Sequence, residues 1–545
     1  MVLQMERKLP YRVENEKAEA SLYASSLMSG MSLWERIGQL FMPQVRLDNT
    51  ADAMHYINKL IRDNAIGGIL FYKGEAAVQI KLYGEACRLS EVPLFISIDA
   101  EWGLAMRLKN TVRFPVNMTL GAVKDIYLIY EYGMMMSRQC RRMGININFA
   151  PVLDVNTNPD NPVIGQRSFG ENPEKVAVKA IAYAKGLEDG GVLSVGKHFP
   201  GHGDTSEDSH KTLPYINSNR DSIINNELYP FGEYIKSGLN GIMTAHLNIP
   251  ALDDSTGLCS SLSPVIVNGL LKSEMGFEGL VFTDALLMRG AVNYENNALK
   301  ALVAGNDVMV MPDDIDRQMK VIENAVRDGI IEEDIIDMHC RSVLEYKYFL
   351  GLHELSAVTE ENLLNDLNNG EAISLSRELF RNSITLMSDV RKQLPLRVEQ
   401  NICLLSLGED ENLTFVALGG SKIEKRVFEK FNLPVFGNNV SINSDTDYGN
   451  VLSGCRDSEL LVIEVFSNKS RYIDIVGSLS ARPGVVIIFY MNPYKIDCFK
   501  DAVNTELNTI VCAFEDSPYA QEFAQKAVFG ETGMTGEMPV KLKWL

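Results

Sequence analysis

Short apolar segments alternate with longer amphipathic segments from about residue 30 to residue 350 of this 545-residue chain. Apolar runs of about four to eight residues are typical of buried parallel strands, and longer periodic segments are typical of helices. Ser32 and Glu35 match a capping box just before the first run. Eight runs are present, at residues 37–42, 67–72, 94–99, 145–150, 192–199, 241–246, 279–284 and 307–312.

Eight strand–helix repeats fit a (β/α)8 barrel. The alternative is an open doubly wound sheet, which usually has fewer strands and a phosphate-binding glycine loop. No strand–helix junction here contains G-x-G-x-x-G. The pattern therefore predicts an α/β fold with a TIM-type barrel over residues 1–352.

A weaker pattern follows the barrel. Residues 353–388 are polar with helical periodicity and are expected to form a helical linker. Five further apolar runs then appear with helices expected between them, which predicts a smaller α/β sandwich at residues 389–545. These runs lie at 402–407, 414–418, 460–466, 485–490 and 509–514.

The amino-acid composition and the net charge limit which kinds of ligand this protein is expected to bind. Hydrophobic residues make up 46% and charged residues 23%, as in a globular protein with a large core. The net charge of −19 argues against nucleic acid and leaves neutral ligands such as sugars open. The eight cysteines form no C-x-x-C pair, so they are expected to be buried small hydrophobes, which favours a reducing compartment.

No apolar run reaches the roughly 18 residues that a membrane span requires, so no span is expected. The segment MVLQMERKLPYRVENEKAEA at the start has no hydrophobic signal core. The sequence as written therefore predicts a cytoplasmic protein, or an exported one if a signal segment was removed.

Five charged or polar residues lie at the ends of four of the predicted barrel strands. Catalytic residues of TIM barrels lie at this end of the strands, and packing alone gives a core strand no reason to end in a charge. Asp284 ends an otherwise apolar strand and is either a pocket carboxylate or the cap of the next helix. The shared placement favours a functional site made of Asp99, Lys197, His198, His246 and Asp284.

The stretch KHFPGHGDTSEDSH, residues 197–210, gathers three of the seven histidines on one irregular loop. It is a metal site, an acid–base site or a solvated loop. Pro200 and Gly201 break the helix on which a His-x-x-x-His zinc pair would lie, which weighs against metal. The possible ligands are His198, His202, Asp204, Asp208 and His210.

Asp208 and His210 fit the acid–base interpretation better. Two positions apart in an extended stretch, their side chains share a side. The carboxylate would orient the imidazole and favour its protonated form, a proton donor near neutral pH. The long polar loop at 148–173 adds Arg167, which suits recognition of hydroxyls or a carbonyl unless it forms only a surface ion pair.

These residues carry a resemblance. KHFPGHGDTSEDSH followed by LP resembles the signature of the β-N-acetylglucosaminidase branch of glycoside hydrolase family 3, in its two-domain bacterial form. The segments NPVIGQRSFGENP, GIMTAH and VFTDALLM are similar to the same branch. The likeness covers residues 30–355 well and the second domain, which ends in GEMPVKL, less specifically.

The resemblance implies retaining hydrolysis of terminal β-linked N-acetylglucosamine. Asp284 would form a covalent glycosyl–enzyme, and His210, oriented by Asp208, would be the acid and base. It further implies no metal or organic cofactor, an N-acetylglucosamine-containing oligosaccharide as partner, a monomer or homodimer, and a role such as peptidoglycan turnover. The implied sugar-binding residues are Asp99, Arg167, Lys197 and His198, with Met243 and His246 near the pocket wall.

Two positions depart from the family pattern. Trp102 stands in DAEWGLAMRL where many members have the first glycine of D-x-E-G-G-x-x-x-R-L, and Ala285 replaces a second aspartate after the nucleophile. Both changes leave the leaving-group preference open. The alternatives are a β-glucosidase or xylosidase of the same family, a phosphorylase, a metallohydrolase and an inactive sugar-binding protein.

Overall fold

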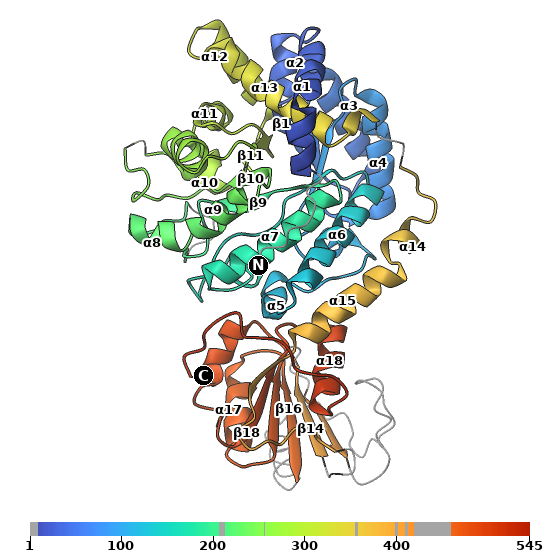
Figure 1. The fold of residues 1–545 in the computed structure, drawn as a ribbon, viewed down its shortest axis with the longest axis vertical. Helices are drawn as coiled ribbons and strands as arrows, with labels where there is room; N and C mark the ends of the chain where they lie inside the picture. Colours follow the sequence, from blue (N-terminus) through green and yellow to red (C-terminus); the bar gives the residue numbers. More distant parts are fainter. Residues whose placement is uncertain are drawn as a thin grey trace. The chain divides into compact units, whose positions relative to one another are not determined.

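The computed structural model describes residues 9–206, 213–255, 257–354, 358–397, 400, 402–408, 413–418 and 459–544 (Figure 1). These residues form two compact units. The first takes its residues from 1–114, 126–168 and 172–373, and the second from 115–125, 169–171 and 374–545. In the part of the chain that is described, no helix combines the length and apolarity needed to cross a membrane.

The first unit is a closed parallel barrel. Its strands pair in chain order, and β12 returns to β1 through Phe41 opposite Met309. A bridge from Phe282 to Val308 joins β11 to β12. The strands are β1 (Phe41–Met42), β2 (Gln44–Val45), β3 (Gly68–Phe71), β5 (Phe95–Ile98), β7 (Ile147–Asn148), β8 (Leu193–Ser194), β9 (Gly196–Phe199), β10 (Gly241–Thr244), β11 (Leu280–Thr283) and β12 (Met309–Val310).

Helices surround this barrel, with α6 and α7 packed side by side (Figure 1). Their bounds are α1 (Leu9–Met28), α2 (Leu33–Gly38), α3 (Thr50–Asn64), α4 (Ala76–Leu89), α6 (Ile126–Arg142), α7 (Pro173–Asp189), α8 (Arg220–Asn225), α9 (Leu228–Lys236), the π-helix η4 (Val265–Glu274), α10 (Arg289–Val292), α11 (Asn297–Ala304), α12 (Ile315–Arg327), α13 (Glu333–Phe349) and α14 (Leu363–Leu367). The predicted barrel fold is confirmed.

The capping box at Ser32 and Glu35 is also confirmed, but it begins a helix that extends into the expected first strand. Ile37 and Gly38 belong to α2, and the strand begins only at Phe41. A short apolar run does not distinguish a buried helical turn from a strand. The expected start of that strand was therefore wrong.

The second unit is an α/β sandwich with sheet order β13-β18-β17-β16-β14-β15, flanked by α17 and α18 (Figure 1). Its inner strands are parallel, and β13 and β15 pair antiparallel at the edges. The elements are α5 (Asn117–Ala122), β13 (Thr385–Ser388), β14 (Ile402–Leu407), β15 (Leu413–Leu418), β16 (Leu460–Val465), α17 (Ser470–Leu479), β17 (Val485–Phe489), β18 (Asn508–Cys512) and α18 (Pro518–Val528). The chain enters this unit within α15 (Gly370–Ser383).

Two details of this sheet differ from the expectation. Residues 385–388, assigned to a helical linker, form β13 against β18. Strand β15 pairs directly with β14 rather than following a helix. Both are edge strands. Pairing with β18, which is distant in the sequence, outweighs the weak local pattern of β13, whereas β15 pairs with its neighbour in the chain.

Candidate active site

Polar side chains from several strands gather at the carboxyl end of the barrel. Asp99 follows β5, Lys197 and His198 lie in β9, and Asp284 follows β11. Parallel strands deliver their carboxyl ends to one face of a barrel, so residues far apart in sequence become neighbours there.

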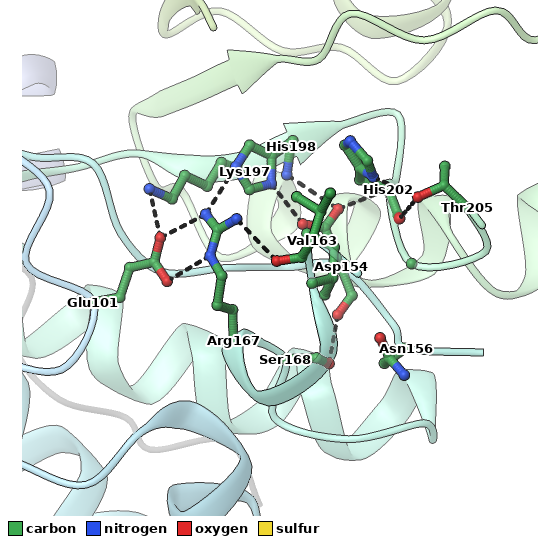
Figure 2. A network of polar contacts seen from close by, with 12 residues as sticks. Glu101, Asp154, Asn156, Val163, Arg167, Ser168, Lys197, His198, His202 and Thr205 are labelled. Atoms are coloured by element: carbon green, nitrogen blue, oxygen red, sulfur yellow. Dashed lines mark hydrogen bonds and ion pairs between the residues drawn. The ribbon is translucent and has the colours of Figure 1, made fainter. Parts of the chain in front are cut away.

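Glu101 is the centre of an ion-pair network that joins three of these strands (Figure 2). Its fully buried carboxylate accepts hydrogen bonds from Arg167 through Nε at 3.0 Å and Nη2 at 2.7 Å. The Lys197 ammonium lies 2.8 Å from Glu101 and donates to Asp99 at 2.9 Å. Arg107 donates to the second Asp99 oxygen at 2.8 Å. The network holds two carboxylates and three cations in fixed positions.

The cations keep both carboxyl groups ionised. Burial by itself would raise the pKa of Glu101, but the Arg167 and Lys197 charges lower it to about 2. Burial likewise opposes ionisation of Asp99, and Lys197 and Arg107 hold its pKa well below the usual range. Charge-assisted hydrogen bonds of this kind suit a ligand rich in hydroxyl groups.

His198 is oriented by Asp154 on the loop after β7. The ring Nδ1 lies 2.6 Å from Asp154 Oδ2, while Asp154 Oδ1 accepts from the backbone N–H of His202 at 2.7 Å. Because the carboxylate accepts the hydrogen on Nδ1, the other ring nitrogen, Nε2, carries a lone pair. This lone pair faces Arg167 Nη2, which lies 3.3 Å away. His202 itself contacts Thr205 at 2.9 Å, and burial lowers the pKa of its ring to about 4. His198 therefore presents a defined tautomer to the network.

Asp284, like Asp99, is a partly exposed carboxylate of the group. Its backbone N–H donates to Thr244 at 2.9 Å, and its Oδ1 accepts from the N–H of Ala285 at 2.8 Å. Burial opposes ionisation, yet the neighbouring positive charge, that of Lys197 included, and the Ala285 N–H lower its pKa on balance. An ionised carboxylate held at the strand end is available as a nucleophile.

Met243 and His246 lie at the end of β10 and just beyond it. Met243 is buried and pairs in register with Phe282 of β11. His246 is 1% exposed and has both ring nitrogens in hydrogen bonds, to Ser261 and to the carbonyl of Ala285. Its place at the pocket wall remains a prediction.

Asp208 and His210 fall outside the described residues, so their proposed pairing remains a prediction. Among the residues that the structure describes, no group of three or more His, Cys, Asp or Glu side chains is arranged to hold a metal ion. Within that part, His198 and His202 are instead bound to Asp154 and Thr205.

Glu101 and Arg107 were not recognised from the residues as members of the site. Glu101 stands two positions after Asp99, a spacing that places both side chains on one side of an extended segment. That spacing was a usable signal. The contact of Asp154 with His198, 44 positions away, has no local signal.

Residues 32–346 match the model of the glycosyl hydrolase family 3 N terminal domain. Beta-hexosaminidase A of Pseudoalteromonas piscicida is 42% identical over 242 residues, covering 41% of this chain but only 40% of that protein. Beta-hexosaminidase LpqI of Mycobacterium tuberculosis is 33% identical over 340 residues, covering 58% of this chain and 82% of the relative.

Two solved structures are similar in fold to this protein over nearly the whole chain. A glycoside hydrolase family 3 β-N-acetylglucosaminidase from Paenibacillus is similar with a TM-score of 0.78 and 29% identity, covering 95% of this chain and 100% of that one. Beta-glucoside phosphorylase BglX is similar with a TM-score of 0.77 at 20% identity, covering 96% of each chain. The second likeness concerns the fold alone.

Proposed function

The chain belongs to glycosyl hydrolase family 3, and we propose that it is a retaining glycosidase that removes terminal β-linked N-acetylglucosamine. The relatives named beta-hexosaminidase and the similar β-N-acetylglucosaminidase support this substrate class. The observation that carries the proposal is the position of the Asp284 carboxylate at the end of β11, where the positive charge of buried Lys197 favours its ionised form.

Asp284 is the proposed nucleophile. Its carboxylate attacks the anomeric carbon, the bond to the leaving oxygen breaks, and a covalent glycosyl–Asp284 ester forms. Water then attacks the same carbon and returns the carboxylate. The Ala285 N–H, 2.8 Å from Oδ1, leaves Oδ2 as the oxygen without this backbone bond.

His210, with Asp208 as its orienting partner, is the proposed acid and base. This assignment rests on the loop motif that ends in DSH. A protonated imidazole donates its proton to the leaving oxygen, and the neutral ring then removes a proton from the attacking water. The carboxylate of Asp208 favours the protonated form needed in the first step.

Asp99, Arg167, Lys197 and His198 are the proposed sugar-binding residues. Each already has a protein partner at 3.3 Å or less, so the sugar meets a rigid set of donors and acceptors. Preorganised groups lose little freedom when a ligand binds. Met243 and His246 complete the proposed wall.

Release of a chromogenic aryl group from a β-N-acetylglucosaminide and from a β-glucoside tests the proposal. Wild type should turn over the N-acetyl substrate selectively, Asp284→Ala should lose at least about 10³-fold in kcat, and His210→Ala should lose about 10² to 10⁴-fold. Equal turnover of the glucoside would indicate a β-glucosidase. Sugar 1-phosphate formed only in phosphate buffer would indicate a phosphorylase.

A further inference from the structure

His246 makes two hydrogen bonds that reach in opposite directions. Its Nδ1 lies 2.6 Å from Ser261 Oγ, and its Nε2 lies 3.1 Å from the backbone carbonyl of Ala285. Ser261 is fully buried and the histidine nearly so. The ring therefore bridges the segment after β10 to the residue that follows Asp284.

The acceptor at one end determines the tautomer. A carbonyl oxygen only accepts, so Nε2 carries the hydrogen and donates to Ala285. Burial lowers the pKa of His246, which keeps the ring neutral. Nδ1 is then a lone pair, and the Ser261 hydroxyl donates to it. The carbonyl of Ala285 thus sets the ring form, and the serine stabilises it by donating to Nδ1.

The residue held in this way also binds the carboxylate of Asp284. The N–H of Ala285 donates to Asp284 Oδ1 at 2.8 Å, and its carbonyl accepts from Met288 N–H at 2.9 Å as well as from His246. The backbone donor and acceptor of Ala285 are therefore both engaged. Movement of the ring would move the donor that orients the carboxylate.

Packing leaves the ring little freedom. Gly290, in α10, lies against it, and a Cβ at position 290 would come within 2.9 Å of the Cβ of His246. The space beside the histidine is filled by backbone, and a larger residue would displace it.

We propose that Ser261 and His246 are positioning residues that hold Ala285 so that the carboxylate of Asp284 faces the anomeric carbon. The inference rests on the proposed role of Asp284 as nucleophile. His246 acts here through the backbone after the nucleophile, in addition to any contact with the sugar.

Two substitutions at position 246 test the two hydrogen bonds of His246 one at a time. The amide nitrogen of His246→Gln takes the place of Nε2 and keeps a donor for Ala285, whereas the shorter His246→Asn reaches only toward Ser261. Ser261→Ala removes the hydroxyl that donates to Nδ1. Ser137→Ala is the matched control, because Ser137 is equally buried but donates to the carbonyl of Met134 at 2.8 Å, within α6.

Steady-state kinetics on the aryl β-N-acetylglucosaminide should show losses in kcat with KM within about twofold of wild type. We expect about 10²-fold for His246→Asn, about tenfold for His246→Gln and about tenfold for Ser261→Ala, because a misplaced reacting group costs rate rather than binding. Ser137→Ala should keep wild-type kcat. Thermal unfolding identifies any variant that fails to fold.

Equal rises in KM for His246→Gln and His246→Asn with wild-type kcat would overturn the proposal and make His246 a sugar contact. Wild-type kinetics for both, or the same kcat for Ser261→Ala and Ser137→Ala, would overturn it as well. Nitrogen-15 NMR of labelled histidines adds a readout independent of turnover, with His246 expected as the neutral Nε2–H form. Full activity of Asp284→Ala would instead refute the proposed function.

Discussion

The guanidinium of Arg167 and the carboxylate of Glu101 face each other through two hydrogen bonds, Nε to Oε2 at 3.0 Å and Nη2 to Oε1 at 2.7 Å. The two residues are 66 positions apart, and the Glu101 side chain is fully buried. Lys197 shares the same carboxylate at 2.8 Å. One buried anion therefore contacts two cations. Without it, Arg167 loses two charge-assisted hydrogen bonds and Lys197 loses one of its two carboxylate partners.

Glu101→Gln should destabilise the protein strongly, because it removes the charge and keeps the shape. Breaking a buried pair costs about 3–5 kcal/mol in the free energy of unfolding. Urea unfolding measures this loss. Glu371→Gln is the control, since its pair with Arg138 has side chains 75% and 60% exposed and should contribute less than about 1 kcal/mol. Equal losses in the two variants would contradict the prediction.

Asp154→Asn should reduce activity by disturbing the tautomer of His198. In one orientation of the asparagine amide, its NH2 group replaces Oδ2 and faces the Nδ1 hydrogen of His198. In the flipped orientation, the NH2 group replaces Oδ1 and faces the backbone N–H of His202. A donor therefore faces a donor in both orientations. If the ring changes tautomer, its Nε2 hydrogen faces Arg167. We expect kcat/KM to fall by roughly 10² to 10³-fold. A value within about threefold of wild type would show that Asp154 does not orient the ring.

Gly201→Ala should disrupt the loop that follows β9. Its φ of +129° favours glycine, and a Cβ would lie 2.5 Å from the Cβ of Glu227. Gly276→Ala is the matched control, with φ +72° and nothing within 4 Å of the added Cβ. We expect about 1–2 kcal/mol for Gly276→Ala and more than about 3 kcal/mol for Gly201→Ala in urea unfolding. Similar losses would mean that Glu227 moves aside without cost.

Glu227→Gln should make the protein more stable at alkaline pH. Burial, together with the Asp204 and Asp154 carboxylates, raises the pKa of Glu227 from 4.5 to about 7. The stabilisation that protonated Glu227 contributes is fully present below about pH 4.5. It is lost as the pH rises through 7, because Glu227 releases its proton at a lower pH in the unfolded chain than in the folded protein. At pH 8 we expect a gain of about 1–3 kcal/mol over wild type and little gain at pH 4.5. Urea unfolding of both proteins at several pH values measures this difference in the free energy of unfolding. A difference that does not vary with pH would refute the prediction.

The sequence was sufficient for the barrel because each strand is a short apolar run bounded by polar residues, and such runs are local. The sequence was insufficient where a strand pairs with another strand that is distant along the chain. Strand β13 looked helical until β18 paired with it, and Ile37 looked like strand although a capping box had already begun a helix. Local pattern decides an element only when tertiary contacts do not oppose it.

The sequence made Asp99, Lys197 and Asp284 candidate site residues, because a charge that ends an apolar strand is visible in it. The loop motif added Asp208 and His210, which lie outside the described residues and stay predictions. The pairing of Arg167 with Glu101, the orientation of His198 by Asp154 and the bridge from Ser261 through His246 to Ala285 were decided by tertiary structure alone. Each joins residues between 15 and 66 positions apart. Hydrogen bonds depend on distances of a few tenths of an ångström and on direction, and only the closed barrel brings those atoms into register.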